Sequence, residues 1–199
     1  KEARIWERLA MIKARAISGE DSFIREVQRT IDNAAFDKAI PAPNELAEEI
    51  DSIRNRAFTE FGKNNSEKID IKKGLGGSSD LDSVIRFFQL SNLHTHPSLR
   101  VKNSFQLLNA LEAAEITDAE ESKEMKRALS FFRLSTSRLR LISNNQIDVL
   151  DEKSELATKA ASMCGFKTAN EFVSEARRLM KQVNDIYERR IKKARKPGP

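Results

Sequence analysis

Apolar side chains recur every three or four residues in segment after segment of this 199-residue chain. Such spacing places them on one face of an α-helix. Seven glycines, five prolines and 7% aromatic residues are few for a β-sandwich. We therefore predict an all-α fold, a helical bundle with at most one short strand or hairpin element near residues 68–73. The predicted helices carry their apolar stripes at residues 5–16, 23–34, 46–61, 81–88, 101–111, 125–142, about 151–163 and 172–186.

The helical pattern is interrupted between residues 62 and 79. A polar loop is followed by the alternating segment Lys68–Lys72, which is typical of a short strand, and then by Gly74, Gly76 and Gly77. Ser79 and Asp82 have the spacing of a capping box, which predicts a helix start. We expect a helical N-terminal piece, a strand with a glycine-rich hinge, a helical bundle and a short tail, at residues 1–66, 67–79, 80–194 and 195–199 respectively.

The net charge of +5 is concentrated near the C-terminus. Residues 188–196 contain six bases and one acid, so acids and bases balance over the rest of the chain. Nucleic-acid-binding proteins usually spread basic residues over a face or groove. We therefore expect no nucleic-acid partner, and we interpret this segment as a solvated helix end favoured by the helix dipole.

Other features indicate the cellular setting. No apolar run approaches the roughly 20 residues of a membrane span, so no membrane partner is expected. The single cysteine, Cys164, excludes an intramolecular disulfide and favours a cytoplasmic location. The chain starts at Lys1 without an initiator methionine, and we interpret it as a segment of a longer protein.

The glycine segment offers two interpretations. Gly76 and Gly77 before a helix start could let the backbone approach a phosphate, and Asp80 and Asp82 could hold Mg²⁺. Alternatively, the glycines turn the chain and the acids stabilise the helix start, and this is the interpretation we favour. Ser79–Asp82 also looks like the Ser-Asp-x-Asp metal motif of polymerase-β-like nucleotidyltransferases. There a Gly-Ser pair precedes the carboxylates by about ten residues, whereas here the glycines are adjacent, so we predict that Asp80 and Asp82 are not that metal pair.

Two further candidates are weaker. His94 and His96 could share a metal, but no nearby cluster completes a site, and a polar loop is favoured. Cys164 has no assigned histidine partner and is expected to be a structural thiol.

Four blocks of the sequence together resemble the bacterial glutamine synthetase adenylyltransferases. They occur in family order and cover nearly the whole chain, but Ser78, Ser79, Asp82 and Ser83 depart from the family pattern. The blocks are Trp6–Arg15, Asp70–Asp82 with its glycine pair, Pro97–Ser104 and Phe131–Arg140. The resemblance therefore indicates a divergent copy.

The resemblance implies what the chain does. Residues 1–66 would be the C-terminal edge of a nucleotidyltransferase domain, and residues 80–194 the helical domain shared with PII uridylyltransferases. The family transfers AMP from ATP, with Mg²⁺, to a tyrosine of glutamine synthetase, removes it by phosphorolysis, and answers to a PII-type regulator. Its catalytic motifs would precede Lys1, so we expect no catalytic residue, no metal ligand and no bound cofactor in this chain, and no transfer activity by the chain alone.

Two functions stay open from the sequence. In the first, the chain is a helical accessory or regulatory domain beside the transfer site. Lys13 and Arg15 are then candidate phosphate contacts, although a solvated face explains them as well. In the second, the chain is a non-catalytic all-α protein-interaction module.

Overall fold

The computed structural model describes residues 5–37, 40–61, 68–144 and 148–195. The polar loop expected at 62–66 and residues 196–199 of the expected tail lie outside these ranges. Among the described residues, no helix combines the length and the apolar character that crossing a membrane requires.

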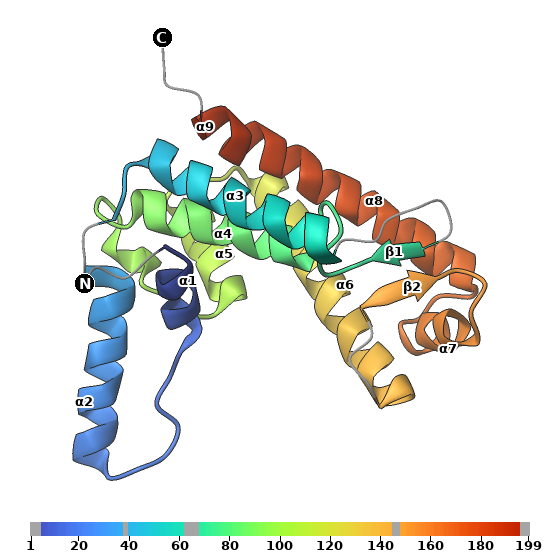
Figure 1. Ribbon diagram of the computed structural model, residues 1–199, viewed down its shortest axis with the longest axis horizontal. Helices are drawn as coiled ribbons and strands as arrows, with labels where there is room; N and C mark the ends of the chain where they lie inside the picture. The colour runs from blue at the N-terminus through green and yellow to red at the C-terminus, as the bar shows by residue number, and fades with distance from the viewer. Residues whose placement is uncertain (1–4, 38–39, 62–67, 145–147, 196–199) are drawn as a thin grey trace.

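Helices make up most of the described chain, and the predicted all-α fold class is confirmed (Figure 1). The helices are α1 (Ile5–Lys13), α2 (Asp21–Asp32), α3 (Pro43–Phe61), α4 (Ser78–Asn92), α5 (Ser104–Ala113), α6 (Ala119–Ser143), α7 (Glu155–Met163), α8 (Ala169–Tyr187) and α9 (Lys193–Arg195). Three short helical turns join them: η1 (Asn33–Asp37), η2 (Pro97–Leu99) and η3 (Glu188–Lys192).

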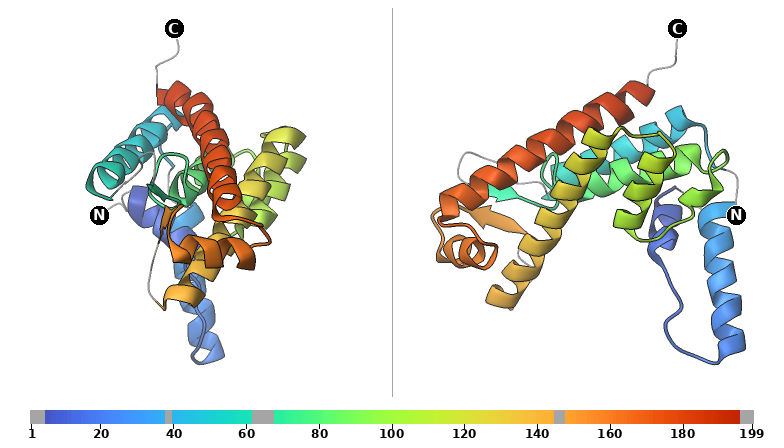
Figure 2. Two further views of the ribbon diagram at one scale, coloured as in Figure 1. Left: turned by 90° about the vertical axis from the view of Figure 1, so that its right-hand side faces the viewer. Right: turned by 180° about the vertical axis from the view of Figure 1, so that it is seen from behind.

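Long helices pack around one hydrophobic core. Helix α4 lies between α3 and α8, and it also contacts α5 and α6. Helix α8 continues through η3 into α9, which packs on α3 (Figures 1 and 2). The buried apolar residues form a single cluster that extends from Ile5 in α1 to Ile191 in η3.

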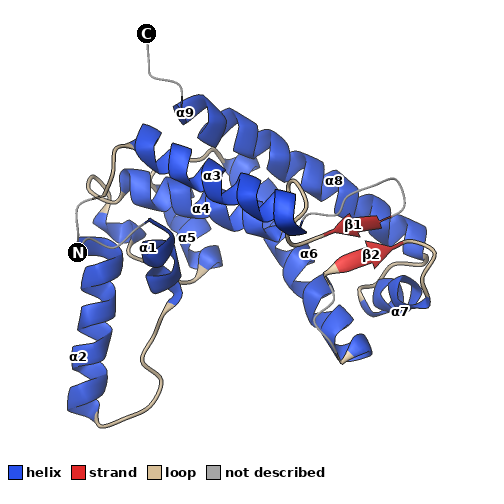
Figure 3. Ribbon diagram, viewed as in Figure 1, coloured by secondary structure: helices blue, strands red, loops and turns tan. Residues whose placement is uncertain are grey.

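Two short strands tie distant parts of the chain together (Figure 3). β1 (Lys68–Asp70) pairs antiparallel with β2 (Val149–Asp151), with Ile69 opposite Leu150. The strand at 68–70 agrees with the alternating pattern there. Its partner was not expected, because three residues that lead into a helix carry too little pattern to indicate a strand.

The three predicted capping boxes have different outcomes, and the helix expected from about residue 151 begins only at Glu155. At α8 the expected Thr168 is the cap, and its Oγ1 accepts from the amide of Glu171 at 3.1 Å, while the Glu171 carboxylate accepts from the amide of Lys167 at 3.0 Å. At α6 the cap is Asp118, one residue after the predicted Thr117. At α4 the cap is Gly77, without a side-chain hydrogen bond, so the box expected from Ser79 and Asp82 is not formed.

The basic C-terminal segment is only partly the solvated helix end that we expected, since Arg189, Lys192 and Lys193 are exposed whereas two other bases pair with buried carboxylates. Arg190 donates to both carboxylate oxygens of Glu121, at 3.1 and 2.7 Å, and Arg195 pairs with Asp51. Both carboxylates are buried, at 4% and 1% exposure. These bases therefore hold η3 and α9 against α6 and α3.

Helix α2 differs from the other long helices. It projects from the bundle (Figures 1 and 2), and none of its residues is buried. Phe23 on its apolar face is 60% exposed, and Ile17 in the preceding loop is 81% exposed. The apolar stripe predicted for α2 therefore exists but is only partly covered, since Val27 and Ile31 are half-buried.

Candidate functional site: a basic groove beside the glycine turn

The glycine turn before α4 is held by its own hydrogen bonds. The amide of Gly76 donates to Asp80 Oδ2 at 2.7 Å, and Arg54 donates to the same oxygen at 2.9 and 2.6 Å. The amides of Ser78 and Ser79 donate to the carbonyls of Ile71 and Lys72. These donors serve the chain itself, which agrees with the structural interpretation of the segment.

Gly76 is required by packing against α8. Its φ is +75°, and a Cβ there would lie 1.8 Å from the carbonyl oxygen of Met180. A Cβ on Gly77 would lie 2.8 to 2.9 Å from three carbonyl oxygens of the turn. Gly76 therefore allows the turn to pack closely on α8, and Gly77 allows the turn itself to close tightly.

A buried polar cluster extends this contact. The Arg54 guanidinium lies 3.8 Å from the centre of the Tyr187 ring, and it donates to Asn184 Oδ1 at 2.6 Å. The Tyr187 hydroxyl donates to Asp51 Oδ1 at 3.3 Å. Burial, and next the charge of Asp51, raise the pKa of Tyr187. The cluster joins α3, α4 and α8 behind the glycine turn.

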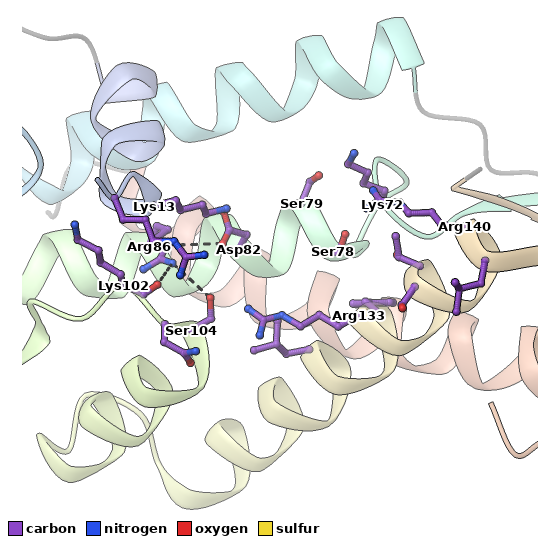
Figure 4. Close-up of a pocket in the computed structure, with 17 residues that line it drawn as sticks. Lys13, Lys72, Ser78, Ser79, Asp82, Arg86, Lys102, Ser104, Arg133 and Arg140 are labelled. Carbon is purple, nitrogen blue, oxygen red and sulfur yellow. Dashed lines mark hydrogen bonds and ion pairs between the residues drawn. The ribbon is translucent and has the colours of Figure 1, made fainter. Parts of the chain in front are cut away.

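A groove of about 930 Å³ lies beside the start of α4 (Figure 4). The loop after α1, the β1–α4 turn, helices α4 and α6, and the start of α5 line it. Its walls carry seven bases against one acid, Asp82. The bases are Lys13, Arg15, Lys72, Arg86, Lys102, Arg133 and Arg140.

Arg86 is one of the residues that line the groove, and its side chain is 1% exposed. One terminal nitrogen donates to Gln89 Oε1 at 2.8 Å, and the other donates to the carbonyl of Lys102 at 3.1 Å. Its Nε makes no hydrogen bond and lies 3.8 Å from Asp82. Burial lowers the pKa of Arg86, Asp82 opposes that change, and the nearby Arg133 adds to it.

Two lysines fasten the segment after α1 to the groove. Lys13 Nζ lies 2.6 Å from Asp82. Lys102 Nζ donates to the carbonyl of Ala14 at 2.8 Å and lies 2.8 Å from Asp32. Both cations are therefore partly neutralised by the chain.

Three arginines of the groove have no carboxylate partner among the described residues: Arg15, Arg133 and Arg140. Arg133 lies over the ring of Phe105, with 5.1 Å from its guanidinium carbon to the ring centre. Hydroxyl groups line the same walls, from Ser78, Ser79, Ser104, Thr136 and Ser137. Chemically, this arrangement suits the binding of an anion.

The predicted site residues divide into two groups. Lys13, Arg15 and Asp82 line the groove. Gly76, Gly77 and Asp80 do not line it, and they belong to the turn and the buried cluster behind it. Whether any of the six contacts a nucleotide stays a prediction.

Sequence reasoning missed five cations of the groove: Lys72, Arg86, Lys102, Arg133 and Arg140. One signal was present, because Arg133 and Arg140 are seven residues apart and therefore share a helix face, with Thr136 and Ser137 between them. Arg86 gave no such signal, since it lies in the predicted apolar stretch of α4.

The other candidates lie outside the groove lining. His96 is close to a neighbouring hydroxyl, with 2.9 Å between its Nδ1 and Thr95 Oγ1. Burial raises the pKa of the Cys164 thiol, so the thiolate is disfavoured. Among the described residues, no group of three or more His, Cys, Asp and Glu is placed to hold a metal ion.

Comparison with known proteins finds similarity to uridylyltransferases and adenylyltransferases. The family model described as GlnD PII-uridylyltransferase matches residues 44–191. The chain is also similar to the bifunctional glutamine synthetase adenylyltransferase/adenylyl-removing enzyme of Bradyrhizobium diazoefficiens, with 25% identity over 194 residues, covering 95% of this chain and 19% of that enzyme. The enzyme of the same name from Agrobacterium fabrum is 28% identical over 188 residues, covering 92% and 18%. The chain thus spans about a fifth of the length of these relatives.

Proposed function

Since this chain belongs to the GlnD PII-uridylyltransferase family, we propose that it serves as the helical accessory or regulatory domain beside the catalytic site of a nucleotidyltransferase. The reaction we propose is the transfer of AMP from ATP to a tyrosine of glutamine synthetase. The similarity to enzymes named glutamine synthetase adenylyltransferase supports this choice. Mg²⁺ as the metal, a PII-type regulator and a cytoplasmic location belong to the same proposal.

We also propose, for the three main parts of the chain, the roles expected from the sequence. Residues 1–66 act as the edge of the nucleotidyltransferase domain, residues 67–79 as its connection, and residues 80–194 as the helical domain. The catalytic carboxylates lie in another part of the longer polypeptide, and this chain alone transfers no nucleotide.

The charge of the groove is the observation that carries the proposal. Seven bases line the groove, from the end of α1 and the loop after it, from the β1–α4 turn and from the helical domain, against a single carboxylate. Nucleotidyl transfer requires cationic groups around the phosphates, where negative charge develops. A groove formed by both parts of the chain is a suitable wall for that site.

The test uses a polypeptide that contains this chain together with a nucleotidyltransferase catalytic domain. Labelled ATP, Mg²⁺ and purified glutamine synthetase are supplied, and label on the synthetase is measured. Arg133→Glu should reduce incorporation at least about tenfold, since a hydrogen bond to a charged group contributes roughly 1.5–3 kcal/mol.

The matched control is Arg56→Glu, on an exposed position of α3 outside the groove. It should leave incorporation unchanged. Equal activity of the two variants would contradict the proposal and favour the alternative, in which the bundle is a protein-interaction module.

A further inference from the structure

We propose that the groove binds a short polyphosphate, either free or as the tail of a nucleotide, through the arginines of α6 and α4. The inference rests on the proposed function only for the choice of a phosphate-bearing ligand. The binding site that it adds takes its main contacts from arginine side chains of α4 and α6, not from the glycines of the turn.

The groove keeps a positive charge after its lysines have paired with carboxylates of the chain. Lys13, Lys72 and Lys102 each have a carboxylate within 4 Å, at 2.6, 3.6 and 2.8 Å. Within the described chain, Arg15, Arg133 and Arg140 have none. The groove therefore keeps an excess of positive charge that its own residues do not neutralise, and a multivalent anion would lower its electrostatic energy.

The buried guanidinium of Arg86 also favours an anion in the groove. Arg86 is held rigidly by Gln89 and the Lys102 carbonyl, yet its Nε has no acceptor in the described structure. A buried donor without an acceptor is costly. Arg133 stands close enough to Arg86 to disfavour its charge. An anion between the two would relieve this repulsion.

The side chains of the groove suit phosphate better than an acidic protein segment. Guanidinium groups match the geometry of phosphate oxygens, and the five hydroxyls of the lining supply additional donors. Carboxylates on alternate residues of an extended peptide are about 7 Å apart. A polyphosphate instead carries several negative charges on a short chain, which suits one groove lined by several bases.

The contacts of Asp82 distinguish this anion site from a metal site. It pairs with Lys13 at 2.6 Å and lies 3.8 Å from Arg86, so it acts as an internal counter-ion of the groove. Replacing it with asparagine should therefore strengthen anion binding in the absence of metal. A metal-ligand role for Asp82 would give the opposite result, a loss that is seen only with Mg²⁺.

The experiment measures binding of inorganic tripolyphosphate to the 199-residue chain by titration calorimetry, without Mg²⁺. The double variant Arg133→Ala/Arg140→Ala should lose at least tenfold in affinity. The control Arg25→Ala/Arg56→Ala removes two arginines at exposed positions outside the groove and should bind as the parent chain does. Circular dichroism confirms that each variant is folded. Asp82→Asn should bind about threefold more tightly, since an exposed ion pair competes weakly.

Equal affinities of the two double variants would overturn the inference. So would tighter binding of a glutamate peptide of the same charge, which would instead indicate an acidic protein partner. Because the measurement needs neither ATP turnover nor glutamine synthetase, its failure is distinct from failure of the proposed transfer reaction. Conversely, tripolyphosphate binding that depends on Arg133 would stand even if glutamine synthetase received no label.

Discussion

Asp80 and Asp82 lie two residues apart and have very different surroundings. Asp80 is buried, and it accepts hydrogen bonds from Arg54 and from the amide of Gly76. The Asp82 side chain is 34% exposed and pairs with Lys13, whose side chain is 53% exposed. Successive positions on a helix face different directions, so one carboxylate enters the core while the other reaches the groove.

This difference gives a prediction for the two alanine variants. Asp80→Ala should lower the free energy of unfolding by about 3–5 kcal/mol, because the buried Arg54 loses its carboxylate partner at 2.6 Å and keeps only the partly exposed Glu188 at 3.5 Å. Asp82→Ala should cost about 0–1 kcal/mol, since its ion pair with Lys13 is exposed to solvent and screened, and its approach to Arg86, at 3.8 Å, is not a hydrogen bond. Urea unfolding followed by circular dichroism measures both. Similar losses for the two variants would show that Asp80 does not have the structural role described here.

Residue-level prediction from the sequence named six candidate site residues, three of which, Lys13, Arg15 and Asp82, line the groove. It also favoured a structural role for the glycines, which agrees with their contacts. It could not identify Arg86. A charged residue between Ile85 and Phe87 does not indicate that Gln89 and the carbonyl of Lys102 will accept its hydrogen bonds. Those partners come together only after α4 and α5 pack.

At the scale of elements, α2 and α8 show what periodicity can predict. Both carry a clear apolar stripe, and both form helices. The stripe of α8 is buried, whereas α2 has no buried residue. Periodicity indicates which face of a helix is apolar, but whether another element covers that face depends on tertiary packing.

The two helices therefore predict different costs for the same substitution. Phe172 in α8 is 0% exposed, so Phe172→Ala should cost about 3–5 kcal/mol of unfolding free energy. Phe23 in α2 is 60% exposed, and Phe23→Ala should change it by no more than about 0.5 kcal/mol. Guanidinium unfolding of the purified chain compares them. A loss above about 2 kcal/mol for Phe23→Ala would mean that another surface covers α2 in solution.

At the scale of the whole molecule, charge is segregated in a way that composition hides. Outside residues 188–196 the acids and bases balance, which suggested a body without a basic face. In the structure seven bases gather in the groove, while a second hollow between α6 and α8 is lined by acids, among them Asp118, Glu124 and Asp185. The net charge counted along the sequence cannot distinguish this arrangement from an even mixture of acids and bases, because it does not record where each charge lies in the folded chain.

The continuous core predicts how the whole chain unfolds. Buried apolar residues form one cluster from α1 to η3, and α3 packs on both α4 and α9. The two pieces on either side of the glycine turn should therefore unfold together, in a single cooperative transition.

The chain contains suitable probes for this prediction, since its only tryptophan is Trp6 in α1 and its only tyrosine is Tyr187 in α8. Tryptophan fluorescence and the near-ultraviolet dichroism of tyrosine should change at the same urea concentration, together with the loss of helix. If Trp6 responds at a lower concentration than Tyr187, residues 1–66 form a separate folding unit. Coincident transitions would instead make the glycine turn a functional boundary within one cooperative unit, across which the groove receives bases from both sides.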